Sequence, residues 1–266
     1  MGTVREAQVE RIRRALVTGA SDGIGEGFAR ALAVRGVELV VTARREDRLH
    51  RLATEVPVDV EVVAADLASP TARARVCERL RDPERPVDLL VNAAGFGAYG
   101  RFVDLDPART QDLLAVNLAA LVDLTRAALP GLLERGHGAV VNVGSIAGAT
   151  PGPFGAVYAA SKAFVGSFTH ALHEELRDTD VRVMLLAPGV TATGFQAAAG
   201  AAAEAIPAVA RMEVGPVVAT ALRDLARGRV VSVPGGLNRL AIVLGPRVPT
   251  ALSRRVSAVI HRRYLG

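Results

Sequence analysis

Short apolar runs alternate with segments of helical periodicity along most of this 266-residue chain. Seven runs rich in Val, Leu and Ala have the length of strands, at residues 15–17, 37–41, 60–64, 87–91, 139–143, 181–186 and 230–233. Segments between them, such as 24–34 and 48–56, place apolar residues three and four apart, as amphipathic helices do. Strands that are apolar throughout are typical of a parallel sheet covered by helices on both faces. The pattern therefore predicts an α/β fold with a doubly wound parallel sheet.

No linker or internal repeat divides the chain, so we expect a single domain with its main body at residues 1–236 and a C-terminal tail at 237–266. In the tail, apolar residues recur at helical spacing among arginines, which predicts a basic amphipathic helix. These apolar residues are Leu252, Val256, Val259 and Ile260. Such a helix docks on its own domain or on a neighbouring subunit, or it lies on an anionic membrane surface. Residues 194–210 are mostly small and fit either a mobile lid or a surface helix.

The uneven charge argues against a nucleic-acid partner. The sequence pI of about 10.2 reflects residues 211–266, where ten arginines stand against two carboxylates. Residues 1–210 hold 22 basic and 25 acidic residues, so the body is slightly acidic. No zinc-ligand spacing and no aromatic–basic RNA motif accompanies the basic tail, so we expect neither a metal nor a nucleic acid.

Cysteine use and hydropathy indicate the cytoplasm. The single cysteine, Cys77, cannot form an internal disulfide, which fits a reducing compartment. The first residues are charged and polar, unlike a signal peptide, and no uncharged apolar run reaches the roughly 18 residues that a membrane span needs. We expect a cytoplasmic protein, with peripheral membrane contact through the tail as the alternative.

A glycine-rich turn joins the first predicted strand to the first predicted helix. It runs from Thr18 through Gly19, Ser21, Asp22, Gly23 and Ile24 to Gly25. Glycines let the backbone approach a pyrophosphate, whose charge the helix N-terminus stabilises through its free N–H groups and dipole. Ligand sites in open parallel sheets lie beyond the carboxyl ends of the strands, where this turn falls. Glycines also terminate strands, but the position favours a phosphate site.

Two arginines, Arg44 and Arg45, follow the second predicted strand. A dinucleotide fold usually places an acidic residue near this point to bind the adenosine ribose, and here the position is taken by Ala43. A guanidinium suits a 2′-phosphate by charge and by paired hydrogen bonds. The alternative, a helix that merely begins with basic residues, is unfavourable because of the helix dipole. The sequence therefore predicts NADP(H) in preference to NAD(H).

The only lysine of the chain, Lys162, follows Tyr158 by four residues, whereas the other 31 basic residues are arginine. On a helix this spacing places both side chains on one face. A lysine ammonium beside a phenol should lower the phenol's pKa and let it act as an acid or base near neutral pH. The alternative is a surface lysine on an ordinary helix.

With these features together, the chain resembles the short-chain dehydrogenase/reductase family over nearly its whole length. Six family motifs occur in order, namely the turn 18–25, Asp66-Leu67, Asn92-Ala93-Ala94-Gly95, Asn117, Ser145 thirteen residues before Tyr158, and Pro188-Gly189 with Thr191 and Thr193. The resemblance implies a Rossmann-type fold and a catalytic tetrad. Tyr158 would donate a proton, Ser145 would bind the substrate oxygen, Lys162 would hold the nicotinamide ribose, and Asn117 would fix a water joining Lys162 to solvent.

The resemblance also implies which residues hold the cofactor. They are Gly19, Ser21, Asp22, Gly23, Ile24, Gly25, Arg44, Arg45, Asp66, Leu67, Asn92, Ala93, Ala94, Gly95, Tyr158, Lys162, Pro188, Gly189, Thr191 and Thr193. Three simpler roles stay open: Ser145 capping a turn, Asn117 bonding only backbone, and Asp66 capping the following turn. Asp22 departs from the basic residue that some NADP-preferring relatives carry, so the 2′-phosphate would rest on Ser21 and the two arginines.

Five further residues are candidates for the substrate pocket: Phe96, Tyr99, Phe154, Phe195 and Gln196. Their aromatic character predicts a lipophilic ketone or aldehyde, although some of these rings could simply belong to the core. The expected protein is thus an NADP(H)-dependent oxidoreductase acting on a C=O or CH–OH group, and the family implies a homodimer or homotetramer. The alternatives are a non-catalytic NADP-binding regulator or scaffold, and a nucleotide-sugar epimerase or dehydratase relative.

Overall fold

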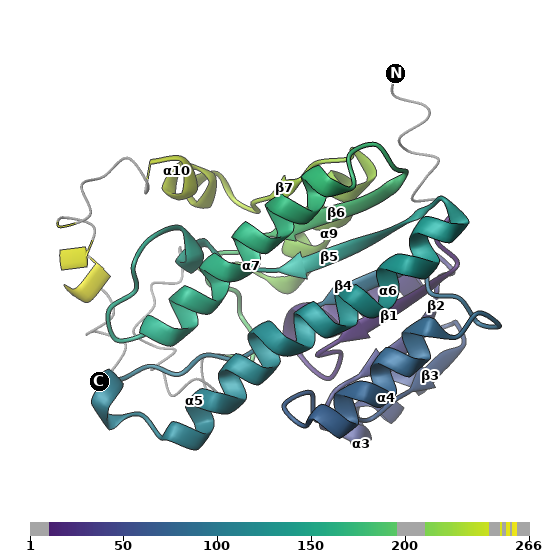
Figure 1. Ribbon diagram of the computed structural model, residues 1–266, viewed down its shortest axis with the longest axis horizontal. Helices are drawn as coiled ribbons and strands as arrows, with labels where there is room; N and C mark the ends of the chain where they lie inside the picture. Colours follow the sequence, from purple (N-terminus) through teal and green to yellow (C-terminus); the bar gives the residue numbers. More distant parts are fainter. Residues whose placement is uncertain (1–10, 196–210, 245–250, 252–253, 256, 260–266) are drawn as a thin grey trace.

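The computed structural model describes residues 11–195 and 211–244, together with 251, 254–255 and 257–259. The seven predicted strands are present and form one parallel sheet in the order β3-β2-β1-β4-β5-β6-β7 (Figure 1). The strands are β1 Arg14–Thr18, β2 Glu38–Thr42, β3 Val60–Val62, β4 Leu89–Asn92, β5 Gly138–Val143, β6 Val181–Leu186 and β7 Val231–Ser232. The strand order reverses between β1 and β4, which is where open α/β sheets bind their ligands. The predicted single-domain, doubly wound α/β fold is confirmed.

Helices connect the strands and cover both faces of the sheet. They are α2 Gly23–Ala33, α3 Glu46–Glu55, α4 Pro70–Arg81, α5 Pro107–Leu114, α6 Leu121–Arg135, α7 Ala156–Glu175, α9 Val214–Ala226 and α10 Gly236–Leu244. Three shorter helical segments are η1 Phe102–Asp104, η2 Ala115–Ala120, which is a π-helix, and η3 Ile146–Ala149. In Figure 1, α4, α6 and α7 run across the front of the sheet.

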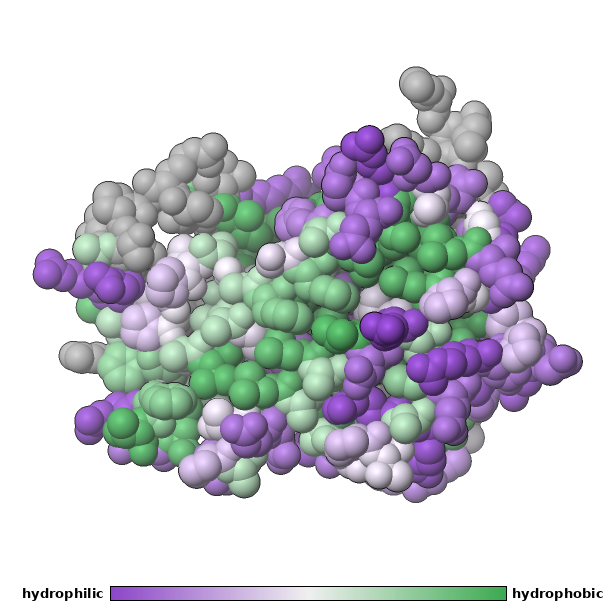
Figure 2. All heavy atoms as spheres, viewed as in Figure 1, coloured by the Kyte–Doolittle hydropathy of each residue, from purple (hydrophilic) through white to green (hydrophobic). Residues whose placement is uncertain are grey.

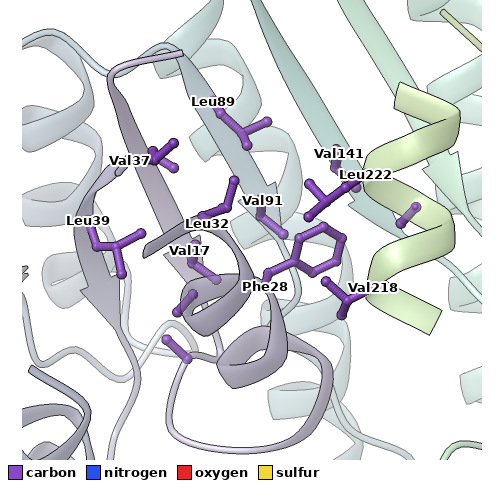
Figure 3. Close-up of a cluster of buried hydrophobic side chains, with 14 of the residues drawn as sticks. Val17, Phe28, Leu32, Val37, Leu39, Leu89, Val91, Val141, Val218 and Leu222 are labelled. Carbon is purple, nitrogen blue, oxygen red and sulfur yellow. The ribbon is translucent and has the colours of Figure 1, made fainter. Parts of the chain in front are cut away.

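Two aliphatic clusters hold the layers together. On one face, Phe28 of α2 and Leu222 of α9 pack against Val17 and Val141 of the sheet (Figure 3). On the other face, the helices α4, α6 and α7 pack against the opposite side of the same strands. Central strands are therefore buried on both sides, which explains why their sequences are apolar throughout.

The helical run Pro107–Arg135, formed by α5, η2 and α6, is long and apolar enough by length and composition to cross a membrane. In the fold it is a core helix, because Leu124, Ala128 and Leu132 are buried in the cluster between the sheet and its helices. Packing against the sheet thus explains the buried apolar residues of this run, whereas Leu133 stays 41% exposed.

Of the apolar residues that define the predicted tail helix, Val259 is described, and Leu252, Val256 and Ile260 lie outside the described residues. The tail begins with α10, and residues 254–255 and 257–259 are also helical. The segment 196–210, for which the sequence suggests either a lid or a surface helix, lies outside the described residues.

Candidate active site

A cavity of about 630 Å³ lies at the carboxyl ends of the strands, where the loops after β1 to β6 meet. The predicted residues on its wall are Gly19, Ser21, Asp22, Gly23, Ile24, Gly25, Arg44, Arg45, Asp66, Leu67, Ala93, Ala94, Gly95, Phe96, Tyr99, Ser145, Tyr158, Lys162, Pro188, Gly189, Thr191, Thr193 and Phe195. Asn92, Asn117 and Phe154 are not on the wall, and Gln196 lies outside the described residues. One cavity therefore joins the glycine turn to the tyrosine–lysine pair.

The glycine turn fits the pyrophosphate of a dinucleotide. Gly19 and Gly23 have φ angles of +67° and +56°, a region that favours glycine. A Cβ at Gly25 would lie 2.4 Å from the carbonyl oxygen of Gly19, so a side chain there would block the turn. Asp22 occupies the N-cap of α2 but makes no side-chain capping bond. The first N–H groups of α2 are thus left for an anion.

Arg45 and Ser21 form a polar corner beside this turn. Arg45 is the N-cap residue of α3, and its Nη2 lies 3.1 Å from Ser21 Oγ and 3.2 Å from Asp22 Oδ2. Arg44 is exposed and lines the same part of the cavity. Two guanidinium groups and a hydroxyl are the donors that a 2′-phosphate requires. The arrangement fits the predicted preference, although Asp22 adds a carboxylate beside the phosphate-binding groups.

Asp66 and Leu67 line the cavity after β3. The Asp66 carboxylate accepts a hydrogen bond from the backbone N–H of Ala68 at 3.0 Å, whereas the N-cap of α4 is Ser69. Asp66 therefore closes the turn before α4 and does not cap the helix itself.

Asn92 lies behind the cavity wall, in a buried polar network. Its Nδ2 donates to Thr125 Oγ1 at 3.0 Å and to Asn142 Oδ1 at 2.9 Å. The network joins β4, β5 and α6, so Asn92 supports the sheet beneath the cofactor region. Ala93, Ala94 and Gly95 form the part of this motif that reaches the cavity.

Loop 188–195, after β6, borders the glycine turn. A Cβ at Gly23 would lie 2.7 Å from Thr193 Cγ2, and one at Gly194 would lie 2.6 Å from Asp22 Oδ2. The loop therefore closes one side of the cavity next to the first turn of α2. Pro188, Gly189 and Thr191 continue this wall.

Tyr158, Ser145 and Lys162 come together on the cavity wall. Tyr158 and Lys162 lie one turn apart on α7, and Lys162 Nζ is 5.9 Å from the centre of the Tyr158 ring. Ser145 is the N-cap of η3, and its Oγ accepts a hydrogen bond from the N–H of Ala147 at 3.1 Å. The side chain of Ser145 also lies close enough to the Tyr158 hydroxyl to lower the pKa of the phenol. Ser145 thus caps a turn and contacts the tyrosine as well.

The structure corrects the expected pKa of the phenol. Burial raises the pKa of Tyr158 to about 12, and the nearby Ser145 side chain opposes this rise. Burial also lowers the pKa of Lys162 to about 8. The Lys162 ammonium donates to the carbonyl oxygen of Val143 at 2.8 Å. The expectation of a lowered tyrosine pKa was wrong because it counted the nearby charge and left out the loss of hydration.

Asn117 lies in the π-helix η2 and holds the loop after β4. Its Oδ1 accepts from the N–H of Phe96 at 3.1 Å, and its Nδ2 donates to the carbonyl of Phe96 at 3.1 Å and to Ser161 Oγ at 3.0 Å. Single π-turns within α-helices often mark functional sites. A Cβ at Gly95 would lie 3.0 Å from Asn117 Oδ1 and 3.5 Å from Lys162 Nζ, so the backbone of Gly95 lies close to both side chains. The role of Asn117 in holding a water stays a prediction.

Aromatic side chains surround the Tyr158 ring. Its centre lies 5.9 Å from that of Tyr99 and 5.4 Å from that of Phe195. The guanidinium carbon of Arg109 lies over the Phe96 ring, 5.2 Å from its centre. Phe154 instead has a φ of +63°, and its carbonyl accepts a hydrogen bond from the N–H of Gly100 at 2.8 Å. It therefore shapes the neighbouring loop from behind the wall.

Several cavity residues were missed by the sequence analysis. They are Ala43, Ala65, Val116, Val143, Gly144, Ile146, Ala147, Ala149, Thr150, Pro151, Gly152, Val190, Gly194 and Ser257. Most of these residues follow the carboxyl end of a predicted strand, and that position could have identified them as part of the cavity wall. Ser257 comes from the tail, and nothing in the sequence pattern pointed to it.

Comparisons with known proteins agree with this geometry. The family model described as short chain dehydrogenase matches residues 13–204. Sulfoacetaldehyde reductase 2 of Chromohalobacter salexigens is 43% identical over 184 residues, covering 68% of this chain and 73% of that protein. A short-chain dehydrogenase from Sphingobium yanoikuyae in complex with NADPH is 35% identical, with a TM-score of 0.81 over 89% of this chain and 94% of that chain.

A third relative is the bulky-bulky ketone specific alcohol dehydrogenase from Comamonas testosteroni. It is 30% identical, with a TM-score of 0.75 over 90% of this chain and 96% of that chain. The family match covers more than half of the chain, and the two solved structures cover 89% and 90% of it. The chain therefore belongs to the short-chain dehydrogenase family and is an oxidoreductase.

Proposed function

We propose that this protein is an NADP(H)-dependent oxidoreductase that interconverts a lipophilic ketone or aldehyde and its alcohol. The observation that carries the proposal is the Tyr158 hydroxyl, buried in the cavity that Ser145 also lines. An acid and an oxygen-binding hydroxyl at one point are what reduction of a carbonyl needs. Binding a cofactor alone would require neither group.

The cavity residues would hold NADP(H) along its length. The glycine turn and the start of α2 would bind the pyrophosphate, and Arg44, Arg45 and Ser21 would bind the 2′-phosphate. Lys162 would hold the nicotinamide ribose hydroxyls. When bound, the nicotinamide supplies or accepts the hydride. The NADPH complex of the Sphingobium relative supports this choice of cofactor.

Tyr158 would deliver the proton. With its pKa raised to about 12, the phenol carries its proton at neutral pH and can act as a general acid. Ser145 would donate a hydrogen bond to the substrate oxygen, where negative charge develops. The Lys162 charge, 5.9 Å from the ring centre, would stabilise the phenolate that remains after proton transfer.

The aromatic wall favours a lipophilic substrate. Tyr99 and Phe195 flank Tyr158, and Phe96 lines the same cavity. Among the described residues of the wall, the cations are Lys162 and the two arginines beside the glycine turn. The two arginines belong to the glycine-turn end, and Lys162, although 5.9 Å from the centre of the Tyr158 ring, donates to the carbonyl of Val143. A bulky neutral ketone therefore fits better beside the aromatic residues than a small sulfonate. The ketone specificity in the name of the Comamonas relative agrees with this choice.

The test is NADPH oxidation against a panel of aromatic, steroid and acyl ketones, with sulfoacetaldehyde included. We expect turnover of bulky neutral ketones and little of the sulfonate. A Tyr158→Phe variant should bind NADPH normally and lose about a hundred- to ten-thousandfold in kcat. A wild type that binds NADPH but reduces no carbonyl on the panel would favour a regulator or scaffold.

Two copies would pair through α6 and α7. Leu133 and Phe164 each leave 41% of their surface exposed, and Phe164 stacks on Phe168. Figure 2 shows a broad hydrophobic area over these helices. Exposed apolar areas of this kind mark protein interfaces. Light scattering should give a homodimer or homotetramer, and Phe164→Glu should reduce the mass to that of a smaller species.

A further inference from the structure

The outer face of α10 is apolar and uncovered among the described residues. Leu237, Leu240 and Leu244 expose 74%, 54% and 46% of their surfaces. Their spacing of three and four residues places them on one side of the helix. The inner side is occupied, because Ile242 packs with Val231 and Val233 on a core cluster. The helix therefore has a second apolar side that the described part of the chain leaves exposed.

Charge in this part of the chain has a single sign. From Leu237 to Gly266 the sequence holds six arginines and no aspartate or glutamate. Arg239 of α10 is exposed, as are Arg254 and Arg255 further along. Val259, in the same part of the tail, is 58% exposed. Exposed leucines and valines beside arginines are the side chains by which a peripheral protein holds an anionic bilayer.

A second copy of the chain is a poorer match for this face. In a two-fold contact the same patch meets itself, so the tail arginines would face arginines with no carboxylate of the tail to neutralise them. An anionic lipid surface supplies the missing negative charge and an apolar layer for the leucines.

The face is also coupled to the cavity. Asn238, on the inner side of α10, contacts the cavity loop: a Cβ at Gly189 would lie 2.5 Å from its Nδ2. Ser257 of the tail borders the cavity itself. We propose that Leu237, Leu240 and Leu244, with Arg239, Arg254 and Arg255, bind the protein reversibly to anionic membranes. The inference does not depend on the identity of the substrate.

The test uses the full chain and lipid vesicles of phosphatidylcholine with and without phosphatidylglycerol. Wild type should sediment with the anionic vesicles and stay in solution with the neutral ones, and high salt should weaken binding. Combining Leu237→Ser, Leu240→Ser and Leu244→Ser should reduce the affinity at least tenfold. Val34→Ser, which changes a side chain 81% exposed on another part of the surface, is the matched control and should bind as wild type does.

Thermal unfolding and NADPH binding must be unchanged in the triple variant, which confirms that α10 still packs. Wild type that remains in solution with anionic vesicles would overturn the proposal, as would a triple variant that binds like wild type. If wild type does not bind vesicles, the oligomer mass of the triple variant shows what else the face does. The informative result is a smaller mass than that of wild type. That result would assign the face to a second copy of the chain.

Discussion

The carboxylate of Asp22 lies 3.2 Å from the guanidinium of Arg45 and 3.7 Å from that of Arg48. Asp22 is the N-cap residue of α2, but its side chain turns away from the helix to meet these arginines. A negative charge therefore lies between the glycine turn and the group proposed to bind the 2′-phosphate. The Asp22 carboxylate would repel the 2′-phosphate, and it neutralises part of the positive charge of Arg45 that would attract the phosphate.

Asp22→Asn should strengthen the preference for NADPH over NADH. The amide keeps an acceptor for Arg45 and removes the charge. Both partners are more than one-third exposed, at 44% and 36%, so solvent screens the pair and its effect is on the order of 0.2–1 kcal/mol. We expect the ratio of KM for NADH to KM for NADPH to rise about 1.4- to fivefold.

The matched control is Asp47→Asn, which removes the same charge from the first turn of α3, where no contact with Arg45 is seen. It should leave the ratio close to that of wild type. If Asp22→Asn weakens NADPH binding instead, the carboxylate serves mainly to position Arg45. High salt should reduce the difference between wild type and Asp22→Asn.

Much of the cofactor end of the cavity could be predicted from the sequence, because its wall is formed by backbone atoms and glycines of one turn. The spacing of Gly19, Gly23 and Gly25 predicts a tight turn that side chains would block. In the structure all three glycines lie in such a turn. The contact between Asp22 and Arg45 could not be predicted from the sequence, because the two residues are 23 positions apart and follow different strands. Only the parallel pairing of β1 with β2 brings the two loops together.

Gly148→Ala should impair catalysis without blocking the cofactor. A Cβ at Gly148 would lie 2.6 Å from the carbonyl carbon of Lys162, which is backbone and cannot rotate away. Relief requires η3 to move from α7, and Ser145, the N-cap of η3, would move relative to Tyr158. Because small displacements of reacting groups are costly, kcat should fall by about ten- to a hundredfold while the Kd for NADPH changes little.

Gly166→Ala is the control for this substitution. Gly166 lies on the same helix α7, and an added Cβ would meet only Leu185 Cδ2 at an ordinary 3.8 Å. Alanine in the helix interior should stabilise the protein by about 0.5–1 kcal/mol and leave kcat unchanged. Equal kcat values in the two variants would show that Ser145 and Tyr158 are not positioned by this contact.

Lys162 should make stability depend on pH in the alkaline range. Its pKa is about 8 in the folded protein against an ordinary value of 10.5, because burial disfavours the charged form. Between these values the unfolded chain binds more protons than the folded one, so stability rises with pH. The cost of burying the charge is fully present below pH 8 and is relieved as the pH approaches 10.5.

The test is to measure the free energy of unfolding in urea for wild type and Lys162→Met, below pH 8 and near pH 10.5. The comparison shows whether stability rises or falls with pH. Relative to the variant, wild type should gain stability as the pH rises from about 8 toward 10.5. Other titrating groups are common to the two proteins and cancel in the difference. A difference that is flat or that falls with pH would contradict a lowered lysine pKa. Tyr158, with its raised pKa, acts with the opposite sign between pH 10 and about 12 in both proteins.

Burial is the part of the site that the sequence pattern could not supply. The spacing of Tyr158 and Lys162 predicted their common face, and the structure brings both to the cavity. Their spacing carries no information on hydration, which depends on α7 lying against η3 and the strands. The same holds for Asn92, whose motif indicated the cofactor but whose side chain faces Asn142 and Thr125. An asparagine within the apolar strand 138–143 was the available signal of a buried polar network.

Asn142→Ala should destabilise the protein strongly. Asn142 lies opposite Asn92 in the pairing of β4 with β5 and has no exposed surface. Its Oδ1 accepts from Asn92, and its Nδ2 donates to Thr169 Oγ1 of α7 at 3.1 Å. Alanine removes both hydrogen bonds and leaves their partners buried without replacement, which should cost about 2–4 kcal/mol in the free energy of unfolding.

A double-mutant cycle with Asn92→Ala distinguishes the hydrogen bond from a loss of packing. If the two amides act as a unit, the double variant should lose less than the sum of the single losses, by about 0.5–3 kcal/mol. Thr54→Ala, which removes an exposed hydroxyl bonded only to Arg51, should change stability by less than about 0.5 kcal/mol. Strictly additive losses would mean that the two asparagines stabilise the sheet independently.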